Sequence, residues 1–350
     1  MPPARYNPLD QLDPASLDLA EDANTLADAL VHDAPGQSGD AHWNEEAKAL
    51  IAGLILHVVT TEPADRRTLA TVRDYLTLAP AGFAALLAAM QDSAGAGGLV
   101  ARAANRQLGK SDREAAGVLS SAQRHTHFLD SPRIVASTAA SDFTFAGLKE
   151  STATVFLCLP PDRLDTYARW LRLLVSQAVT DMARSTVRPP QPVLFLLDEF
   201  AALGRLEPVD RAMGLMAGYG LQLWPTLEDM HQLRANYGER AGTFMSNAGV
   251  VQAFGVNDHA TADMLSKTLG DTTIEYQTVG TSGPSSIFAG GSYSESTSAH
   301  VSARRLATPD EIMRMRPDQV LLLRQGEHPF AVEKIRYYDQ REFARLFDPA

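Results

Sequence analysis

The stretch PVLFLLDEFAALG, residues 192–204, decides the fold. An apolar run from Val193 to Leu197 ends in two carboxylates, Asp198 and Glu199. A continuous apolar run of this length is typical of a parallel strand that is covered on both faces. In a nucleotide-hydrolysing fold, carboxylates at such a strand end bind Mg²⁺ and orient the attacking water. The pattern therefore raises the question of where the accompanying phosphate-binding loop lies.

The two acids have a catalytic and a structural interpretation. In the catalytic one, Asp198 holds Mg²⁺ directly or through water, and Glu199 orients and deprotonates the attacking water. In the structural one, a strand simply ends in two solvated acids. The next predicted strand, LQLWPT, leads into LEDMHQL, and ligands bind at the carboxyl ends of strands in such sheets. Glu228 in that segment is a third candidate catalytic residue, because it is placed to reach the terminal phosphate.

The only GKS triplet in the chain does not supply the phosphate loop. A P-loop has the form G-x-x-x-x-G-K-[ST] and directly follows a strand. Here the residue five before Gly109 is Ala104, and the preceding LVARAANRQL has a helical pattern. Ser111 instead opens a helical stretch with Glu114 three residues later, the spacing of a capping box. The sequence therefore predicts a sheet without its first strand and phosphate loop, and the unpaired edge favours pairing with another chain.

Composition and charge limit the class of protein. With 350 residues and 45% apolar content, the chain is long enough for two domains and a sizeable core. The net charge of −11 gives no general attraction to nucleic acid or anionic lipid, although a local basic groove stays open. The longest apolar stretch, ALIAGLILHVV, is too short to span a bilayer, so we expect a soluble chain without a transmembrane segment. The single cysteine, Cys158 in TVFLCLP, predicts a buried, inert thiol in a reducing compartment.

The sequence pattern changes near residue 131. Residues 17–131 show Ala-rich amphipathic helices, which predict an all-α domain after a connecting segment at 1–16. Residues 132–350 alternate strands and helices, which predicts a doubly wound α/β domain with a parallel sheet. The strand candidates are ATVFLCL, VLFLLD, LQLWPT, VVQAFG, QVLLL and FAVEKIRYY, and the predicted helices cover 162–184, 207–217, 229–235 and 259–269.

Two local signals follow in the second half of the α/β region. Residues 278–302 are rich in Ser, Gly and Thr, which predicts a flexible excursion or a long hairpin tip. In TPDEI, Thr308 is a predicted N-cap, Pro309 takes the first helical position and Glu311 completes a capping box.

Histidine and tryptophan residues add one candidate site. His125 and His127 are two apart on a predicted helix, so they face different directions and predict no shared metal. Trp170 and Trp224 lie in apolar segments and are interpreted as core or interface residues. Trp43, in GDAHWNEEA at the edge of the helical domain, is a candidate anchor for a partner.

Seven segments together resemble the type IV secretion system coupling proteins, the TraG-like conjugative DNA transfer ATPases. These segments are YNPLDQLDP, DAHWNEEAKALIAGL, TVFLCLPPDRL, VLFLLDEFAALGRLE, AGYGLQLWPTLEDMHQLRANYG, NAGVVQAFGVNDHATADMLSKTLG and RRLATPDEIM. The resemblance runs over nearly the whole chain in the family's order. It implies a RecA-like, P-loop NTPase-type sheet with an inserted all-α domain. It also implies that the membrane-spanning region and phosphate loop of the family lie upstream of these residues.

The resemblance further implies a homo-hexameric motor or gate that uses Mg-ATP at the cytoplasmic face of the bacterial inner membrane. It would recruit relaxase-bound DNA or effector proteins to components of the secretion channel. Asp198 would match the magnesium-associated acid and Glu199 the catalytic base. In the family the all-α domain recognises substrates, and its mildly acidic outer face here favours a basic or mixed protein signal over naked DNA.

Two departures from the family pattern leave the activity open. Many relatives carry Gln where Glu228 stands, and a carboxylate that faces a phosphate oxygen repels it. Some relatives carry an arginine in the segment that reads GLMAGYG here; Arg205 and Arg211 are the nearest substitutes, and each is more simply a solvated surface residue. The chain is thus either an ATPase portion whose P-loop is supplied from elsewhere, or a non-catalytic recruitment module or product of a truncated gene.

Overall fold

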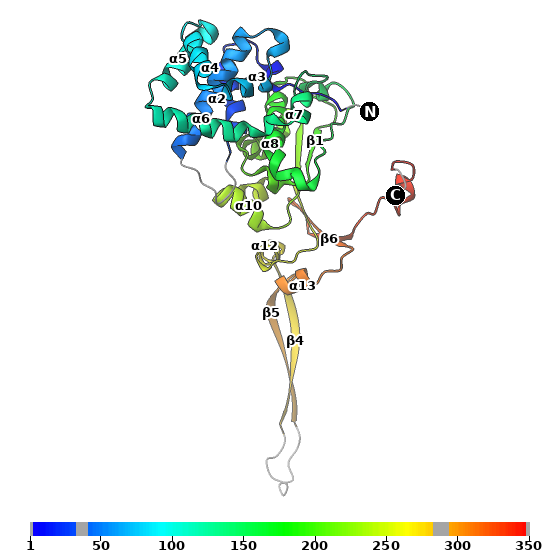
Figure 1. The fold of residues 1–350 in the computed structure, drawn as a ribbon. Helices are drawn as coiled ribbons and strands as arrows, with labels where there is room; N and C mark the ends of the chain where they lie inside the picture. The colour runs from blue at the N-terminus through cyan, green and yellow to red at the C-terminus, as the bar shows by residue number, and fades with distance from the viewer. Residues whose placement is uncertain (1–2, 33–40, 283–293, 348–350) are drawn as a thin grey trace. The chain divides into compact units, whose positions relative to one another are not determined.

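The computed structural model describes residues 3–32, 41–282 and 294–347, and Figure 1 follows them in chain order. The chain separates into two compact units. The first comprises residues 1–227 and 235–240, and the second comprises residues 228–234 and 241–350.

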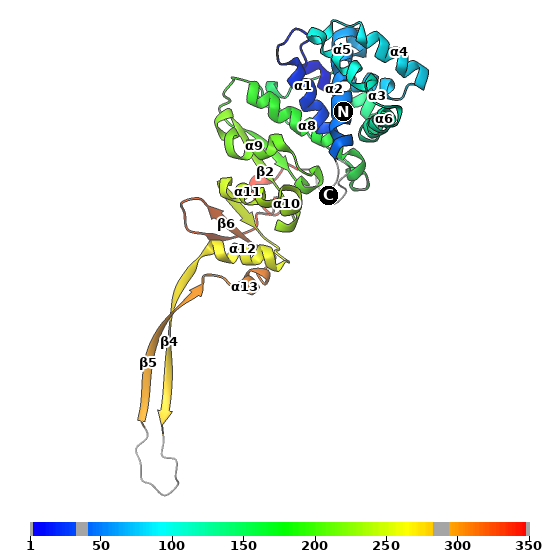
Figure 2. The same ribbon diagram turned by 90° about the vertical axis from the view of Figure 1, so that its left-hand side faces the viewer.

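The first unit begins with the predicted all-α region. Its helices are α1 (Leu19–Leu30), α2 (Ala41–Thr61), α3 (Leu69–Leu76), α4 (Pro80–Gln91), α5 (Gly95–Leu108) and α6 (Asp112–Thr126). Helix α2 is central, because it packs against α1, α5 and α6 and is almost wholly buried from Leu50 to Val59 (Figures 1 and 2). A helix that is apolar on all sides is typical of such a buried position. Within the described ranges, no helix is both long enough and apolar enough to cross a bilayer.

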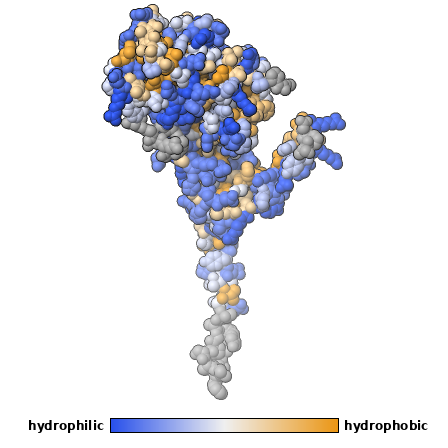
Figure 3. Space-filling view, in the orientation of Figure 1, coloured by the Kyte–Doolittle hydropathy of each residue, from blue (hydrophilic) through white to orange (hydrophobic). Residues whose placement is uncertain are grey.

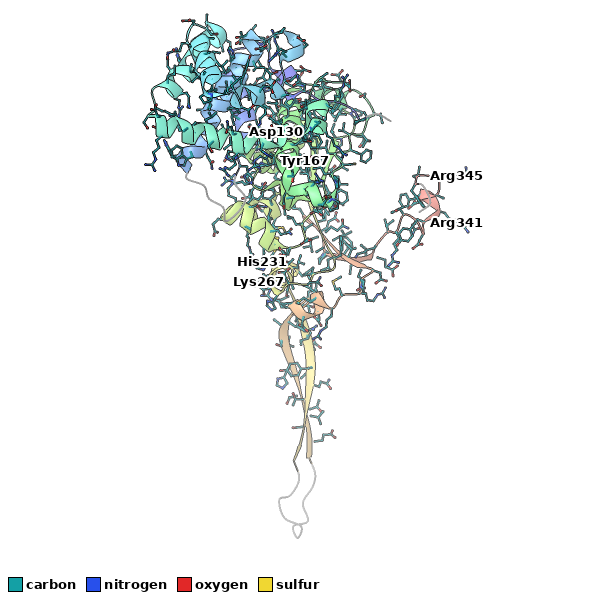
Figure 4. The ribbon with its side chains drawn as sticks, in the orientation of Figure 1. Asp130, Tyr167, His231, Lys267, Arg341 and Arg345 are labelled. Carbon is teal, nitrogen blue, oxygen red and sulfur yellow. The ribbon has the colours of Figure 1, made fainter. Side chains whose placement is uncertain are left out.

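Helix α7 (Pro132–Ser137) and the long helix α8 (Leu164–Arg184) follow the all-α region. Helix α8 packs against α1, and Leu173 is completely buried in the same hydrophobic core. Trp170 is half-buried against that core, as its apolar segment predicts. The residues around the expected boundary at 131 contact helix α8: Ser131 Oγ lies 3.2 Å from Tyr167 Oη. Figure 4 labels Tyr167 and, next to Ser131 in the chain, Asp130. The division into domains at residue 131 stays a prediction.

The segment ATVFLCL does not form the predicted strand. Residues 152–160 are not assigned to any strand, and the Phe156 side chain is 80% exposed. Cys158 is also exposed, so the prediction of a buried thiol is wrong. The physical reason is that no other described segment pairs with it, because an extended segment becomes a strand only through backbone hydrogen bonds to another one.

Strands β1 (Val193–Leu197) and β2 (Leu221–Pro225) form a parallel pair, with helix α9 (Glu207–Leu215) in the crossover between them. In their register Leu196 lies beside Trp224. These two side chains and Leu194 are between 47% and 62% exposed on one face of the pair. Trp224 is therefore not a core residue, and one face of this short sheet is open in the described chain.

The second unit has its own small sheet. It contains β3 (Val250–Ala253), β6 (Gln319–Arg324) and β7 (Phe330–Glu333) in the order β3-β6-β7, all antiparallel. The predicted strand QVLLL forms β6, and only the first four residues of FAVEKIRYY form a strand, β7; neither extends a parallel sheet. The reason is that residues 325–329 form too short a connection for a parallel crossover and suit a hairpin. Helices α11 (Ala241–Asn247) and α12 (His259–Leu269) complete this part, and α10 (Met230–Tyr237) has its first residues in this unit.

A long two-stranded hairpin extends from α12 and α13 (Pro309–Met313) in Figure 1. Strands β4 (Asp271–Ser282) and β5 (Ser294–Arg305) pair antiparallel along their whole length, and the Tyr276 and His300 rings stack at 5.3 Å. The predicted hairpin tip is thus the end of a longer ribbon; residues 283–293 of that segment lie outside the described residues. Where it is coloured in Figure 3, the ribbon surface mixes hydrophilic and hydrophobic residues. The capping box of Thr308 and Glu311 at α13 is confirmed.

A glycine at the contact of α2 with α5 gives a stability prediction. A Cβ on Gly53 would lie 2.4 Å from the Cβ of Ala103, so Gly53→Ala forces the two helices apart. We expect this variant to lose about 1–3 kcal/mol of unfolding free energy in urea titrations. Gly82→Ala is the matched control, because its Cβ would meet Leu78 at an ordinary 3.6 Å and alanine favours a helix. Equal stability of the two variants would contradict this account of the helix contact.

Candidate functional site: the carboxylate pair at the end of strand β1

The two predicted carboxylates stand where β1 leaves the sheet. The carbonyl of Leu197, the last residue of β1, accepts a hydrogen bond from Thr226 N at 2.9 Å, just beyond β2. This bond brings the carboxyl ends of the two parallel strands together. Asp198 and Glu199 follow directly, and both side chains are exposed. Both therefore meet solvent at the strand edge where ligands of parallel sheets bind.

Glu228, the third predicted site residue, lies in the second unit. Its backbone N–H donates to Gln232 Oε1 at 3.1 Å, and its carboxylate accepts from Gln232 Nε2 at 3.0 Å. The side chain is exposed. Its participation in a site with Asp198 stays a prediction.

The carboxylate pair can supply only part of a magnesium site. Mg²⁺ takes oxygen ligands in an octahedron, usually one or two carboxylates together with waters and substrate phosphates. Over the described ranges, no three His, Cys, Asp or Glu side chains are grouped so as to hold a metal ion. Asp198 and Glu199 therefore fit a cation whose remaining ligands are phosphate and water oxygens.

The loop after the carboxylates is packed from several sides. It begins with η6 (Phe200–Leu203), in which Phe200 is 1% exposed and stacks on Tyr237 with 5.8 Å between ring centroids. Asn236 Nδ2 donates to the carbonyl of Ala201 at 3.1 Å. Gly204 has φ 62° and ψ −160°, a conformation that a side chain would strain. The loop that follows the exposed carboxylates is therefore held in place by several contacts.

Sequence reasoning missed the buried residue that holds this loop. Arg172 of α8 donates through Nη1 to the carbonyl oxygens of Leu203 and Arg205, the latter at 2.9 Å. Burial lowers the pKa of Arg172 to about 10, so the guanidinium still carries its charge at neutral pH. The only signal in the sequence was an arginine inside the apolar run WLRLLV.

The two arginines considered as substitutes for a family arginine are surface residues. Arg205 lies 3.5 Å from Glu207 in an ion pair, and its side chain is half-exposed. Arg211 is exposed on α9.

The GKS triplet is confirmed as a helix junction. Gly109 ends α5, and Ser111 caps α6 by accepting a hydrogen bond from Glu114 N at 3.3 Å. Lys110 Nζ lies 2.6 Å from the Glu46 carboxylate. The Glu114 carboxylate faces Lys110 instead of the Ser111 backbone, so half of the predicted capping box forms.

Trp43 and the two histidines have ordinary packing environments. Trp43 is half-buried over Gly117, where an added Cβ would meet the indole ring at 2.6 Å. Its role as a partner anchor stays a prediction. His125 is completely buried, whereas His127 is mostly exposed beside Asp130, so the two rings lie in different environments.

Comparisons with known proteins identify the fold and the family of this chain. A family model described as "Type IV secretory system Conjugative DNA transfer" matches residues 2–348. The protein VirD4 of Rhizobium rhizogenes is 29% identical over 62% of this chain and 32% of its own length. The conjugal transfer protein TraG of Escherichia coli is 28% identical over 89% of this chain and 51% of its own length. This chain thus spans about a third to a half of these curated relatives.

The structure of the bacterial conjugative coupling protein TrwBΔN70 superposes with a TM-score of 0.71, at 16% identity, over 94% of this chain and 71% of that one. TrwB has also been solved in complex with ADP and Mg²⁺. The likeness shows that the fold is RecA-like, an NTPase-type sheet accompanied by an all-α domain. The match over residues 2–348 shows that the chain belongs to the type IV secretory system conjugative DNA transfer family.

The ion pairs at the helix junction predict a pH-dependent stability. Hydrogen bonds from Arg106 lower the pKa of Glu46 to about 2, from an ordinary value of 4.5. Because the folded pKa is depressed, this stabilisation is complete above pH 4.5 and is lost as the pH falls toward 2. We expect Glu46→Gln to lose about 1–3 kcal/mol at pH 7, with the difference from the native protein shrinking at pH 3. Urea titrations at both pH values measure it.

The neighbouring Glu45 provides the matched control. Its side chain is 67% exposed and pairs with Lys48 on the surface, so Glu45→Gln should change stability little at either pH. If Glu46→Gln lowers the unfolding free energy equally at both pH values, packing and not the charge is responsible.

Proposed function

We propose that this chain is the part of a conjugative coupling protein that carries the catalytic acids and recruits substrates. The observation that carries the proposal is the pair Asp198–Glu199 at the carboxyl end of β1, beside the end of β2. A carboxylate there can hold Mg²⁺ directly or through water, and the next one can orient and deprotonate the attacking water. The proposed reaction is ATP hydrolysis that energises substrate transfer.

The phosphate loop in this proposal comes from polypeptide outside these residues. The 350 residues contain no G-x-x-x-x-G-K-[ST] motif, and the GKS triplet is occupied by helix capping and ion pairs. Asp198 and Glu199 could complete a magnesium shell only with phosphate and water oxygens. The complex of TrwB with ADP and Mg²⁺ supports Mg-nucleotide as the ligand. When bound, the cation would neutralise phosphate charge, while Glu199 holds the water and takes its proton.

The proposed substrates are relaxase–DNA complexes or effector proteins, delivered by homo-hexamers to components of a secretion channel at the inner membrane. The all-α region is the proposed recruiting part. Acidic side chains outnumber basic ones in residues 17–131. Where they are exposed, they favour basic or mixed protein signals over naked DNA. Figure 3 shows hydrophilic and hydrophobic residues interspersed over these helices, a surface that suits protein contacts.

A second candidate function is recruitment without catalysis. It is favoured by the lack of a phosphate loop in these residues and by Glu228, whose carboxylate would repel a nucleotide phosphate. In that case the α/β region serves as a scaffold for the all-α region.

Nucleotide binding distinguishes the two functions. A ligand that binds only the folded form raises the melting temperature in proportion to RT ln(1 + [L]/Kd). We expect no shift for the 350-residue chain at millimolar Mg-ATP, and a clear shift for the product of the complete coding region. In that product Glu199→Gln should lower kcat by about 100-fold or more with nucleotide binding retained, whereas Asp198→Asn should weaken the Mg²⁺-dependent shift.

Glu239→Gln is the matched control for the ATPase assay, because Glu239 is an exposed glutamate outside the proposed site. If the complete product neither binds Mg-ATP nor depends on Glu199, the recruitment module is the correct function.

Substrate preference has a separate test. With a net charge of −11, the chain should bind a labelled DNA duplex at 0.15 M salt no more tightly than a Kd of about 10 µM in fluorescence anisotropy. Submicromolar binding that weakens steeply with salt would overturn the preference for protein signals and reveal a local basic groove.

A further inference from the structure

One buried arginine joins the all-α region to the loop behind the candidate carboxylates. Arg172 of α8 is 4% exposed. Besides its two bonds to the loop carbonyls, its Nε donates to the carbonyl oxygen of Ala29 at 3.4 Å. Ala29 lies in the last turn of α1, which packs beside α8 (Figure 2). A single rigid guanidinium therefore binds α1 and the loop at the same time.

The three bonds depend on one another. Within the described ranges, the hydrogen-bond partners of Arg172 are carbonyl oxygens, and no carboxylate neutralises it. A buried cation without a counter-ion needs every available dipole, since its desolvation is costly. The carbonyls of Leu203 and Arg205 lie outside regular secondary structure hydrogen bonding, so they need a donor in turn. Neither α1 nor the loop can move alone without leaving buried polar groups unpaired.

A second set of contacts fixes the position of the loop relative to the end of α1. The end of α1 leads to His32, whose carbonyl accepts a hydrogen bond from Arg169 Nη2 at 3.0 Å. A Cβ on Gly204 would lie 2.4 Å from His32 Nε2, so the loop backbone passes directly against this ring. The loop is therefore bound by Arg172 and lies directly against His32. Both contacts depend on the position of α1.

We propose that Arg172 is a positioning residue that couples helix α1 of the all-α region to the carboxylates Asp198 and Glu199. Occupation of the all-α region by a substrate would shift or stiffen α1, and the guanidinium would pass this change to the loop that begins one residue after Glu199. The catalytic consequence rests on the proposed function. The mechanical link between α1 and the loop does not.

Hydrogen exchange of the full 350-residue chain tests the link without nucleotide. In Arg172→Met, amides in residues 198–206 should exchange about tenfold faster or more, while amides of the α2 core stay protected. Arg172→Lys should restore part of the protection, because an ammonium can still donate to the loop carbonyls. Arg184→Met is the matched control: Arg184 ties the other end of α8 to Asp22 of α1 and should leave the loop unchanged.

A double-mutant cycle tests the coupling itself. Ala29→Gly loosens the last turn of α1 and should speed exchange in residues 198–206 of the native background. In the Arg172→Met background it should add nothing, because the connection is already broken. Ala20→Gly, in the first turn of the same helix, is the control and should not affect the loop.

The outcomes separate this inference from the proposed function. Additive effects, or acceleration that spreads equally to the α2 core, would overturn the coupling and leave Arg172 a structural residue. If Arg172→Met does not fold, Arg172→Lys and Ala29→Gly carry the same test. In the complete coupling protein, Arg172→Lys should lower kcat by about tenfold with KM for ATP unchanged. A protein without ATPase activity but with the exchange coupling would refute only the proposed function.

Discussion

The parallel pairing of β1 with β2 is the constraint on which the candidate site depends. It aligns the carboxyl ends of two strands, and the bond from Thr226 N to the Leu197 carbonyl closes the pair just before Asp198. Without that register, the segment with the two acids would not be held beside the end of β2. With it, both acids emerge at the strand edge where ligands of parallel sheets bind. Within the described residues, the face of the pair that carries Leu194 and Trp224 is open.

Helix α8 connects this strand pair with the all-α region. On one side it contributes Leu173 to the core that also contains α1 and α2. On the other side it presents Arg172 to the backbone of the loop after the acids. Apolar packing fixes where α8 lies, whereas the guanidinium fixes the loop relative to it. The two kinds of contact differ in number: apolar packing sums many weak contacts, whereas the buried guanidinium depends on the few acceptors that it reaches.

The sequence was sufficient for features that depend on local chemistry. The all-α region, the helix at 162–184, the cap at Thr308 and the strand before Asp198 follow from periodicity and capping residues, and the structure has them. It was not sufficient for features that depend on neighbours. ATVFLCL has the composition of a strand but pairs with no described segment, and Cys158 is exposed. Arg172 gave almost no signal, because its partners are backbone carbonyls far away in the sequence.

The same distinction explains the incomplete chemistry of the site. A metal ion that is bound by protein side chains alone needs a cluster of acidic, histidine or cysteine side chains. The described residues contain no such cluster. An acid pair at a strand end is instead complementary to a ligand that brings its own oxygens. Few contacts stabilise such a site before its ligand binds, so its geometry must be fixed by contacts to the neighbouring backbone. Among the described residues, no side chain pairs with the two exposed carboxylates, whereas the loop that follows them is bound by Arg172, Asn236 and Tyr237. Preorganisation in this chain therefore lies in the buried backbone of the loop and not in the acids themselves.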